Sequence, residues 1–366
     1  MIFVSTEDLK TGMRLAKPIY NKNGVLLYDR NTKLTMQGIV SVKNFGLIGL
    51  YILEPAEPLP PMTKDDIEFE RFQTMAVFAV RDELSALANG QKLKGIMKLA
   101  NMVVKNYGNL NHKITFAQNL RSTEDFVFKH AINVAILSAM ISHQLDLSIS
   151  EQLDVVIASL LYDVGRLTLP VEMQDHVTWM DEQEKEIIRK AQNDGYEMIN
   201  NDLSLSSGVK RIVSQSFRTY DFQGLDKERK VSVGAKILQV AHYFDMKTAM
   251  KLNAEPESEL SVIREIFEDE NRFEHQIVRA LLQSIRILSP GVCVQMTSGE
   301  KGLVIRENEK DPMRPMVLGF DSNHIYNLEM DSVYEKTQIA DLMKTMDNRI
   351  IVGNDILQEY LEKTKS

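Results

Sequence analysis

One run of residues, DFVFKHAINVAILSAMI at 125–141, limits the fold of this chain more than any other feature. It is apolar on nearly every side of a helix, although it carries a lysine and a histidine. Such a helix needs apolar neighbours all around it, so it belongs in the centre of a helical bundle. Its histidine, His130, would then lie among other helices.

The apolar periodicity divides the chain into segments. Residues 1–53 read as a small strand-rich domain, with a predicted hairpin at an Asn-Gly turn. Four of the ten prolines fall in 54–62, which predicts a stiff linker. Residues 63–120 are predicted connecting helices, 121–288 the main helical domain, and 289–366 a C-terminal β-hairpin and terminal helix. The expected fold class is therefore mostly α, with a small β-rich N-terminal domain and a C-terminal β-hairpin.

Composition indicates a soluble globular chain, with 44% apolar and 26% charged residues. The first ten residues, MIFVSTEDLK, contain acids and lack the basic start of a signal peptide. No later run approaches the ~18 uninterrupted apolar residues of a membrane span. The single cysteine, Cys293, lies in a strand-like run and suits a buried thiol in a reducing compartment. We expect a cytoplasmic protein with no membrane span.

Charge is unevenly distributed along the chain. The net charge of −8 argues against binding to a nucleic acid polymer, because phosphate binding needs a basic face. Residues 208–251 nevertheless hold nine basic and four acidic residues, a local balance of +5, and residues 252–274 have a balance of −6. Solvated helix faces and a local anion site both fit this alternation.

A recognisable motif lies at LLYDVGRLTLP, residues 160–170. It is similar to the LLHDIGKLGIP-like stretch of HD-GYP domains, and the preceding run predicts a helix that stops at Gly165. The likeness extends to four further segments: FVFKHAINVAILS, KEIIRKAQNDGYEMI, KRIVSQSFRTYDFQGLD and ILQVAHYFDMKTAM. The resemblance implies an HD-domain-like helical bundle from bacterial signalling.

The resemblance also implies a set of metal ligands, because the family hydrolyses cyclic di-GMP with two or three metal ions. His130 and Asp163 stand at ligand positions of the family, and His242 replaces the later metal-binding aspartate. Two imidazoles and one carboxylate could hold a single Zn, Fe or Mn ion, which is the alternative to no metal at all. Five other ligand positions carry residues that break the family's set: Tyr162, Ala191, Ser216, Phe217 and Arg218.

A purely structural interpretation stands beside the metal site. His130 could be a core histidine that hydrogen-bonds Asp163. Asp163 could instead bond local backbone near its helix end. His242 could be an ordinary, partly exposed residue.

Basic residues around the altered motifs could bind an anionic ligand directly, replacing the metal by charge-assisted hydrogen bonds. The family lysine that helps to hold the substrate is an arginine here, which keeps the charge and changes the geometry. Solvated surface charge is the alternative for this set. The candidate ligand-binding residues are Arg166, Lys210, Arg211, Arg218 and Asp221.

The sequence therefore predicts an HD-GYP-like pseudoenzyme without catalytic residues. We expect a signalling or scaffolding module with protein partners, no cofactor, and a homodimer as one candidate assembly. The alternatives are a cyclic dinucleotide receptor that does not hydrolyse its ligand and a single-metal phosphohydrolase with altered chemistry.

Overall fold

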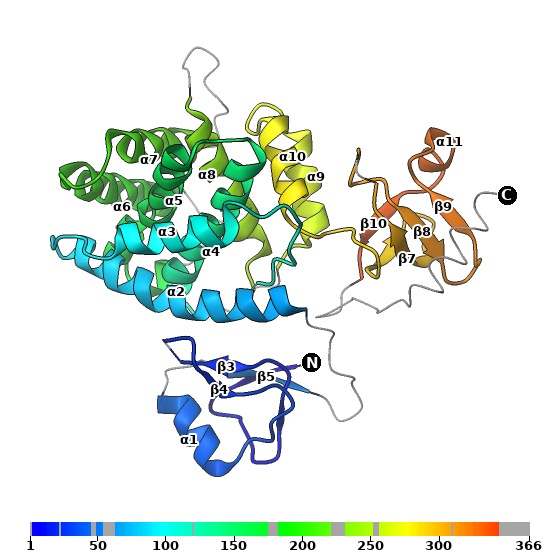
Figure 1. The fold of residues 1–366 in the computed structure, drawn as a ribbon, viewed down its shortest axis with the longest axis horizontal. Helices are drawn as coiled ribbons and strands as arrows, with labels where there is room; N and C mark the ends of the chain where they lie inside the picture. The colour runs from blue at the N-terminus through cyan, green and yellow to red at the C-terminus, as the bar shows by residue number, and fades with distance from the viewer. Residues whose placement is uncertain are drawn as a thin grey trace. The chain divides into compact units, whose positions relative to one another are not determined.

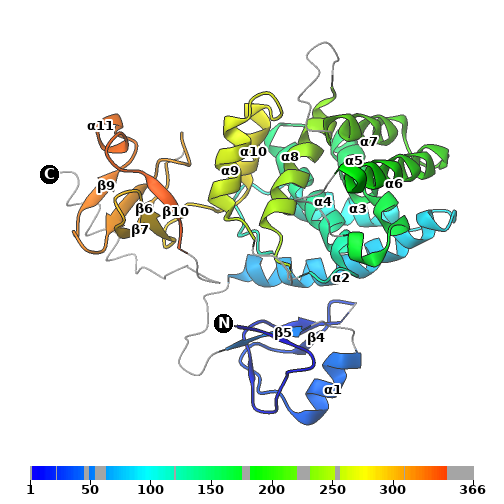
Figure 2. The same cartoon turned by 180° about the vertical axis from the view of Figure 1, so that it is seen from behind.

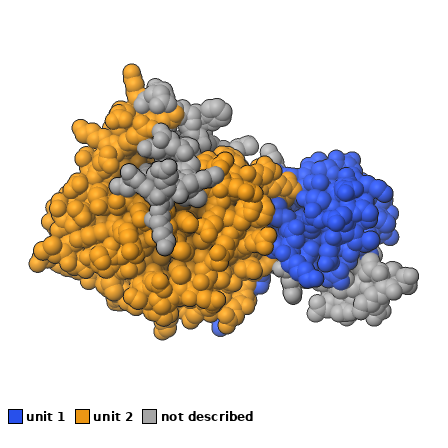
Figure 3. Space-filling view, turned by 90° about the horizontal axis from the view of Figure 1, so that it is seen from above, with its two compact units in different colours: residues 1–21, 25–67, 286–366 blue, residues 22–24, 68–285 orange. Residues whose placement is uncertain are grey.

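The structure is a computed structural model, and two compact units divide it (Figure 3). The first unit comprises Met1–Asn21, Val25–Ile67 and Arg286–Ser366, and the second comprises Lys22–Gly24 and Glu68–Ile285. The residues that the structure describes are 2–21, 23–44, 49–53, 63–118, 121–174, 182–220, 231–251, 256–308 and 310–343.

The N-terminal part of the first unit is a small β-rich fold with one helix, as the sequence predicts. A three-stranded antiparallel sheet has the order β1-β5-β2, and β3 pairs with β4 in the predicted hairpin. Leu15, Leu34 and Val42 form the centre of its apolar core. Its elements are β1 (Ile2–Ser5), β2 (Arg14–Leu15), β3 (Ile19–Tyr20), β4 (Leu26–Tyr28), α1 (Met36–Asn44) and β5 (Gly49–Leu53). The proline-rich linker at 54–62 lies outside the described residues.

The C-terminal part of the first unit is a five-stranded antiparallel sheet with the order β10-β6-β7-β8-β9. Strands β6 and β7 form the predicted hairpin, and β8 pairs with β7 as a third strand. A terminal helix is wrong for 339–342, which pair with β6 as strand β10, and residues 344–366 lie outside the described part. The elements are β6 (Cys293–Met296), β7 (Lys301–Arg306), β8 (Met316–Gly319), β9 (Ile325–Asn327), α11 (Asp331–Tyr334) and β10 (Ile339–Leu342).

The second unit is a helical bundle, which confirms the mostly α fold class (Figure 1). Its α-helices are α2 (Lys64–Ala88), which begins in the first unit, α3 (Ile96–Tyr107), α4 (Phe126–Gln144), α5 (Ile149–Leu161), α6 (Glu182–Asn201), α7 (Ser207–Tyr220), α8 (Val233–Thr248), α9 (Glu259–Glu268) and α10 (His275–Ser284). Two 3₁₀ helices, η1 (Val164–Thr168) and η2 (Val171–Met173), follow α5.

Helix α4 is the central element of the bundle, as its apolar sequence predicts. It packs against α3, α5, α8 and α10, and Figure 2 shows it within the helices from the opposite side. Its length and composition would suit a membrane span, but 89% of its most apolar window is buried inside the protein. Its hydrophobicity is therefore explained by packing against other helices.

The helix before the motif ends earlier than expected. Helix α5 stops at Leu161, Tyr162 caps it, and the chain continues as η1 from Val164. Gly165 is needed for close packing, since a Cβ atom there would lie 1.9 Å from the backbone oxygen of Ala191 on α6. This contact holds η1 directly against the backbone of α6 and fixes the direction in which the chain leaves α5.

Candidate functional site

Two helices supply most of the buried polar centre of the helical unit. Helix α4 contributes His130 and Asn133, and α8 contributes His242 and Asp245. Each pair is spaced by three residues, so its members share one helix face. Because α4 packs against α8, the two faces meet inside the bundle. The C-cap residue of α5, Tyr162, reaches the same place.

His130 lies at the middle of this centre and uses both ring nitrogens. Its Nδ1 atom is 2.6 Å from Oδ2 of Asp245. Its Nε2 atom contacts the hydroxyl of Tyr162 and lies 3.0 Å from Nδ1 of His242. The Tyr162 hydroxyl is 2.7 Å from the same His242 nitrogen. All four side chains are buried.

One arrangement of protons satisfies these contacts. His130 donates from Nδ1 to the Asp245 carboxylate, which leaves Nε2 as an acceptor for the Tyr162 hydroxyl. The Nδ1–H group of His242 then donates to the oxygen of Tyr162. Each of the three aromatic side chains is neutral in this arrangement, and no cation is needed among them.

Burial favours these neutral forms. It lowers the pKa of His130, although the bond to Asp245 acts in the opposite direction. Burial lowers the pKa of His242 well below its ordinary value, and the neighbouring His130 lowers it further. For Tyr162, burial raises the pKa well above its ordinary value, and the charge of Asp163 adds to this. These three side chains are therefore uncharged, and the buried charges of the centre belong to other residues.

Asp245 is the buried anion, and it is fully paired. Nη1 and Nη2 of Arg121 lie 2.7 Å and 2.6 Å from its two carboxylate oxygens. Gln118 and Asn133 donate further hydrogen bonds to Oδ1. Burial alone would raise the pKa of Asp245, but the charge of Arg121 and the bond from His130 hold that pKa below its ordinary value. The carboxylate is therefore ionised in the folded protein.

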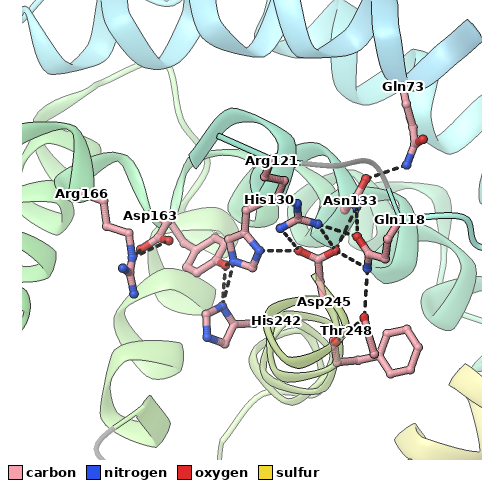
Figure 4. Close-up of polar contacts among 12 residues, drawn as sticks. Gln73, Gln118, Arg121, His130, Asn133, Asp163, Arg166, His242, Asp245 and Thr248 are labelled. Atoms are coloured by element: carbon pink, nitrogen blue, oxygen red, sulfur yellow. Dashed lines mark hydrogen bonds and ion pairs between the residues drawn. The ribbon is translucent and has the colours of Figure 1, made fainter. Parts of the chain in front are cut away.

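Asp163 belongs to a separate pair. Nε of Arg166 lies 3.0 Å and 2.9 Å from its two carboxylate oxygens, and Nη1 of Arg166 donates to the backbone oxygen of Gln174. Figure 4 shows Asp163 and Arg166 facing each other. Both side chains are buried. The carboxylate that His130 bonds is thus that of Asp245, where the sequence suggested Asp163.

The candidate metal ligands are only partly brought together. His130 and His242 meet, and His242 is buried where the sequence left open an exposed position. The Nε2 lone pair of His130 is occupied by the Tyr162 hydroxyl, and Asp163 faces Arg166. No group of three His, Cys, Asp or Glu side chains in the described part of the chain could hold a metal ion. These residues therefore do not fit the single-metal site.

At the other ligand positions where this sequence departs from the family, the described side chains pack or form hydrogen bonds within the protein. Ala191 packs with Leu169 and Ile188 in a small apolar cluster. The buried hydroxyl of Ser216 donates to the backbone oxygen of Val213, 2.8 Å away. The side chain of Phe217 is not described.

The candidate ligand-binding residues whose side chains are described lie on two elements, η1 and α7. Arg166 is buried against Asp163, whereas Arg211 is exposed on α7. Lys210, also on α7, donates to the backbone oxygen of Asn200 at 2.8 Å. The Arg218 side chain and the whole of Asp221 lie outside the described residues.

Sequence reasoning missed the residues that hold the centre together. Asp245 is one of the four acidic residues of the segment 208–251, and it follows His242 by three residues on one helix. That spacing was the available signal for a shared face. Arg121 gave no comparable signal, because its burial depends on the packing of α4 against α8. The missed residues are Gln118, Arg121, Asn133 and Asp245.

Comparisons with known proteins agree with the motif resemblance. Residues 115–271 match the family model described as "HD domain". The chain is 22% identical over 237 residues to the cyclic di-GMP phosphodiesterase PA4108 of Pseudomonas aeruginosa, an alignment that covers 64% of this chain and 56% of that protein. It is 20% identical over 196 residues to the cyclic di-GMP phosphodiesterase PdeB of Borreliella burgdorferi, covering 51% of this chain and 50% of that protein. The chain thus spans about half the length of these relatives.

One solved structure is also similar. It is Bd1817, an HDG"Y"P protein from Bdellovibrio bacteriovorus, with a TM-score of 0.43 and 12% sequence identity. The match covers 76% of this chain and 97% of that chain.

Proposed function

We propose that the chain acts in cyclic di-GMP signalling by binding a protein or a ligand and not by hydrolysis, because residues 115–271 match the HD domain model and the chain is similar to cyclic di-GMP phosphodiesterases. One observation carries this proposal. The His130 nitrogen that faces the centre bonds the Tyr162 hydroxyl, in the region where the family's chemistry needs a metal ion. Hydrolysis of the phosphodiester requires ions that polarise the phosphate and generate the nucleophile.

The pairing of Asp163 supports the same proposal. A carboxylate is a useful metal ligand only while its charge is available to the ion, and here that charge faces the guanidinium of Arg166. A metal ion near Asp163 would have to displace this buried pair and would meet the like charge of Arg166. The single-metal phosphohydrolase is therefore the weakest of the three hypotheses.

A module of this kind acts through its surfaces. We propose protein partners in bacterial signalling, reached in the cytoplasm, and a homodimer as one assembly. Negative overall charge makes a nucleic acid polymer an unsuitable partner.

The proposal is tested by incubating the purified full chain with cyclic di-GMP and separating the products by chromatography. The reaction is run with added Mn²⁺, with Mg²⁺, and with a chelator. We expect the nucleotide to remain intact under all three conditions. Linear dinucleotide or GMP in amounts that increase with protein concentration and incubation time would overturn the proposal.

A nucleotide receptor is the second candidate function, and the basic segment around α7 favours it. Arg211 is exposed on this helix, within the stretch whose charge balance is +5. An anion held by such residues binds through charge, so its affinity falls as salt rises. Arg166 would contribute only if the anion displaced Asp163 from it.

Calorimetric titration with cyclic di-GMP at two salt concentrations tests this second function. We expect Arg211→Ala to weaken binding and Lys92→Ala, a substitution of another exposed basic residue, to leave it unchanged. Equal effects of the two substitutions would contradict a site on α7. Absence of heat at every concentration would leave protein partners as the better proposal.

A further inference from the structure

Arg121 and Asp245 form a buried ion pair in the polar centre. Its role in stabilising the centre is separate from the proposed function, because it does not depend on whether a nucleotide binds. Both side chains have an exposure of 0%. The guanidinium forms two parallel hydrogen bonds to the carboxylate, at 2.7 Å and 2.6 Å. A planar guanidinium matches a carboxylate in this way, and the geometry fixes both groups.

Arg121 is itself held in position by neighbouring groups. Its backbone N–H donates to the backbone oxygen of Met250 at 2.9 Å, and it forms a β-bridge with Lys251. These contacts tie it to the chain immediately after α8, the helix that carries Asp245. Its guanidinium also lies 5.3 Å from the ring centre of Phe126, a ring that stacks on His130.

Amide side chains complete the surroundings of the carboxylate. Gln118 donates to Asp245 at 3.0 Å and accepts from Arg121 at 2.7 Å. Asn133 donates to Asp245 at 2.9 Å and accepts from Gln73 on α2 at 2.8 Å. This network reaches from α2 through α4 to α8 and fixes the carboxylate from several sides.

The ion pair compensates the negative charge of the carboxylate that is buried in the bundle. A buried carboxylate is costly unless a cation and hydrogen bonds compensate it. In metal centres, a carboxylate often orients a ligating histidine through the ring nitrogen that does not face the metal. Here Asp245 takes that orienting position on Nδ1 of His130, and the compensating cation is a side chain of the same protein.

We propose that Arg121 is the positioning residue of this centre. Its guanidinium holds the Asp245 carboxylate where that carboxylate fixes the Nδ1–H form of His130. The cation that compensates the buried carboxylate is therefore a side chain of the protein. The stability of the helical unit does not depend on a bound metal ion.

The test uses the full chain and the variants Arg121→Met, Arg121→Lys and Arg121→Met/Asp245→Asn. Arg189→Met is the matched control, because Arg189 pairs with Glu186 on the surface and is 40% exposed. Thermal unfolding is followed by circular dichroism with chelator, without it, and with added Mn²⁺ or Zn²⁺. Histidine NMR of ¹⁵N-labelled protein reports the proton on Nδ1 of His130.

We expect chelator to leave the unfolding temperature of the wild type unchanged. Arg121→Met should lower that temperature by roughly 10 °C, since it leaves a buried carboxylate without its cation. Arg121→Lys should lower the unfolding temperature less, because lysine keeps the charge but cannot form the bidentate contact. The double variant should recover roughly half of the loss, because removing both partners leaves no unpaired charge.

The NMR signal separates positioning from general stability. The hydrogen-bonded Nδ1 proton of His130 should be protected from exchange in the wild type and in Arg189→Met. It should shift and exchange faster in Arg121→Lys, even where that variant is fully folded. An unchanged signal in Arg121→Lys would overturn the positioning role.

Two further results would contradict the proposal. One is a chelator-induced fall in the unfolding temperature of the wild type. The other is an Arg121→Met variant that melts at the temperature of Arg189→Met. If Arg121→Met yields no folded protein, a folded double variant supports the proposal, and a double variant that also fails to fold contradicts it.

Discussion

Two carboxylates, one in the helical unit and one in the C-terminal sheet, show how differently the same group can be stabilised. Asp245 is wholly buried and depends on the opposite charge of Arg121. Glu300 lies at the surface at the end of the turn between β6 and β7, and within the described part of the chain its hydrogen bonds come from neutral groups. It accepts from the backbone N–H groups of Asp321 and Ser322 and from the hydroxyls of Ser322 and Tyr326.

The ionised form of one carboxylate is stabilised mainly by an opposite charge, and that of the other by neutral hydrogen-bond donors. Donors to Glu300 lower its pKa to about 2, although water reaches the group. Asp245 keeps a lowered pKa only because the charge of Arg121 and the bond from His130 outweigh burial. Loss of one partner should therefore be severe at Asp245 and mild at Glu300, because water can replace a donor only at the surface.

The largest effect should come from Asp245→Ala. It leaves the guanidinium of Arg121 buried without its anion and removes the acceptor of the His130 Nδ1 proton. Breaking a buried pair from one side costs about 3–5 kcal/mol in the free energy of unfolding. Urea denaturation should show a midpoint lowered accordingly. A loss below about 1 kcal/mol, the scale of an exposed ion pair, would remove the distinction between the two carboxylates.

An intermediate effect is expected for Asp163→Asn. The side chain stays nearly the same size and can still accept from Arg166, whose Nη1 also bonds the backbone oxygen of Gln174. We expect a loss of about 1–3 kcal/mol, the range for weakening a buried hydrogen-bonded group. The same urea series measures it. A loss as large as that of Asp245→Ala would show that every buried carboxylate here is equally dependent on its cation.

The smallest effect should come from Glu300→Gln, and it should depend on pH. Because the folded pKa of Glu300 lies below the ordinary value of 4.5, its ionised form stabilises the sheet above that value. This contribution is lost as the pH falls from 4.5 through about 2. The wild type should lose its small advantage over Glu300→Gln across this range.

NMR titration of the Ser322 amide proton checks the assignment, because this N–H donates to Glu300 at 2.8 Å. A midpoint near the folded pKa of about 2 is expected. A midpoint at the ordinary glutamate value would mean that these hydrogen bonds do not form in solution.

The sequence predicted most helices and hairpins well, because these elements follow from the periodicity of the apolar residues. The all-round apolar run became the central helix α4, and α5 begins with a capping box formed by Ser148 and Glu151. The hairpin of β6 and β7 was equally readable. Strand β10 was missed, since its pairing with the distant β6 is not encoded in its local pattern.

The site was predicted only in part. The motif located His130, Tyr162 and His242, which do meet. It could not say which carboxylate would bond His130, because Asp163 is close in sequence to Tyr162 while Asp245 reaches His130 through helix packing. Arg121 could not be distinguished from a surface arginine by composition, spacing or charge count.

The metal content of the purified protein tests the central claim, that a hydrogen-bonded centre stands in place of a metal site. Elemental analysis is applied to the wild type, to Tyr162→His and to His130→Ala, all prepared without chelator. The wild type should carry well under one equivalent of Zn, Fe or Mn, because the Tyr162 hydroxyl occupies the His130 nitrogen. Tyr162→His should carry more, since it offers a third imidazole beside His130 and His242, yet should not hydrolyse cyclic di-GMP. Stoichiometric metal in the wild type that is lost in His130→Ala would contradict the account.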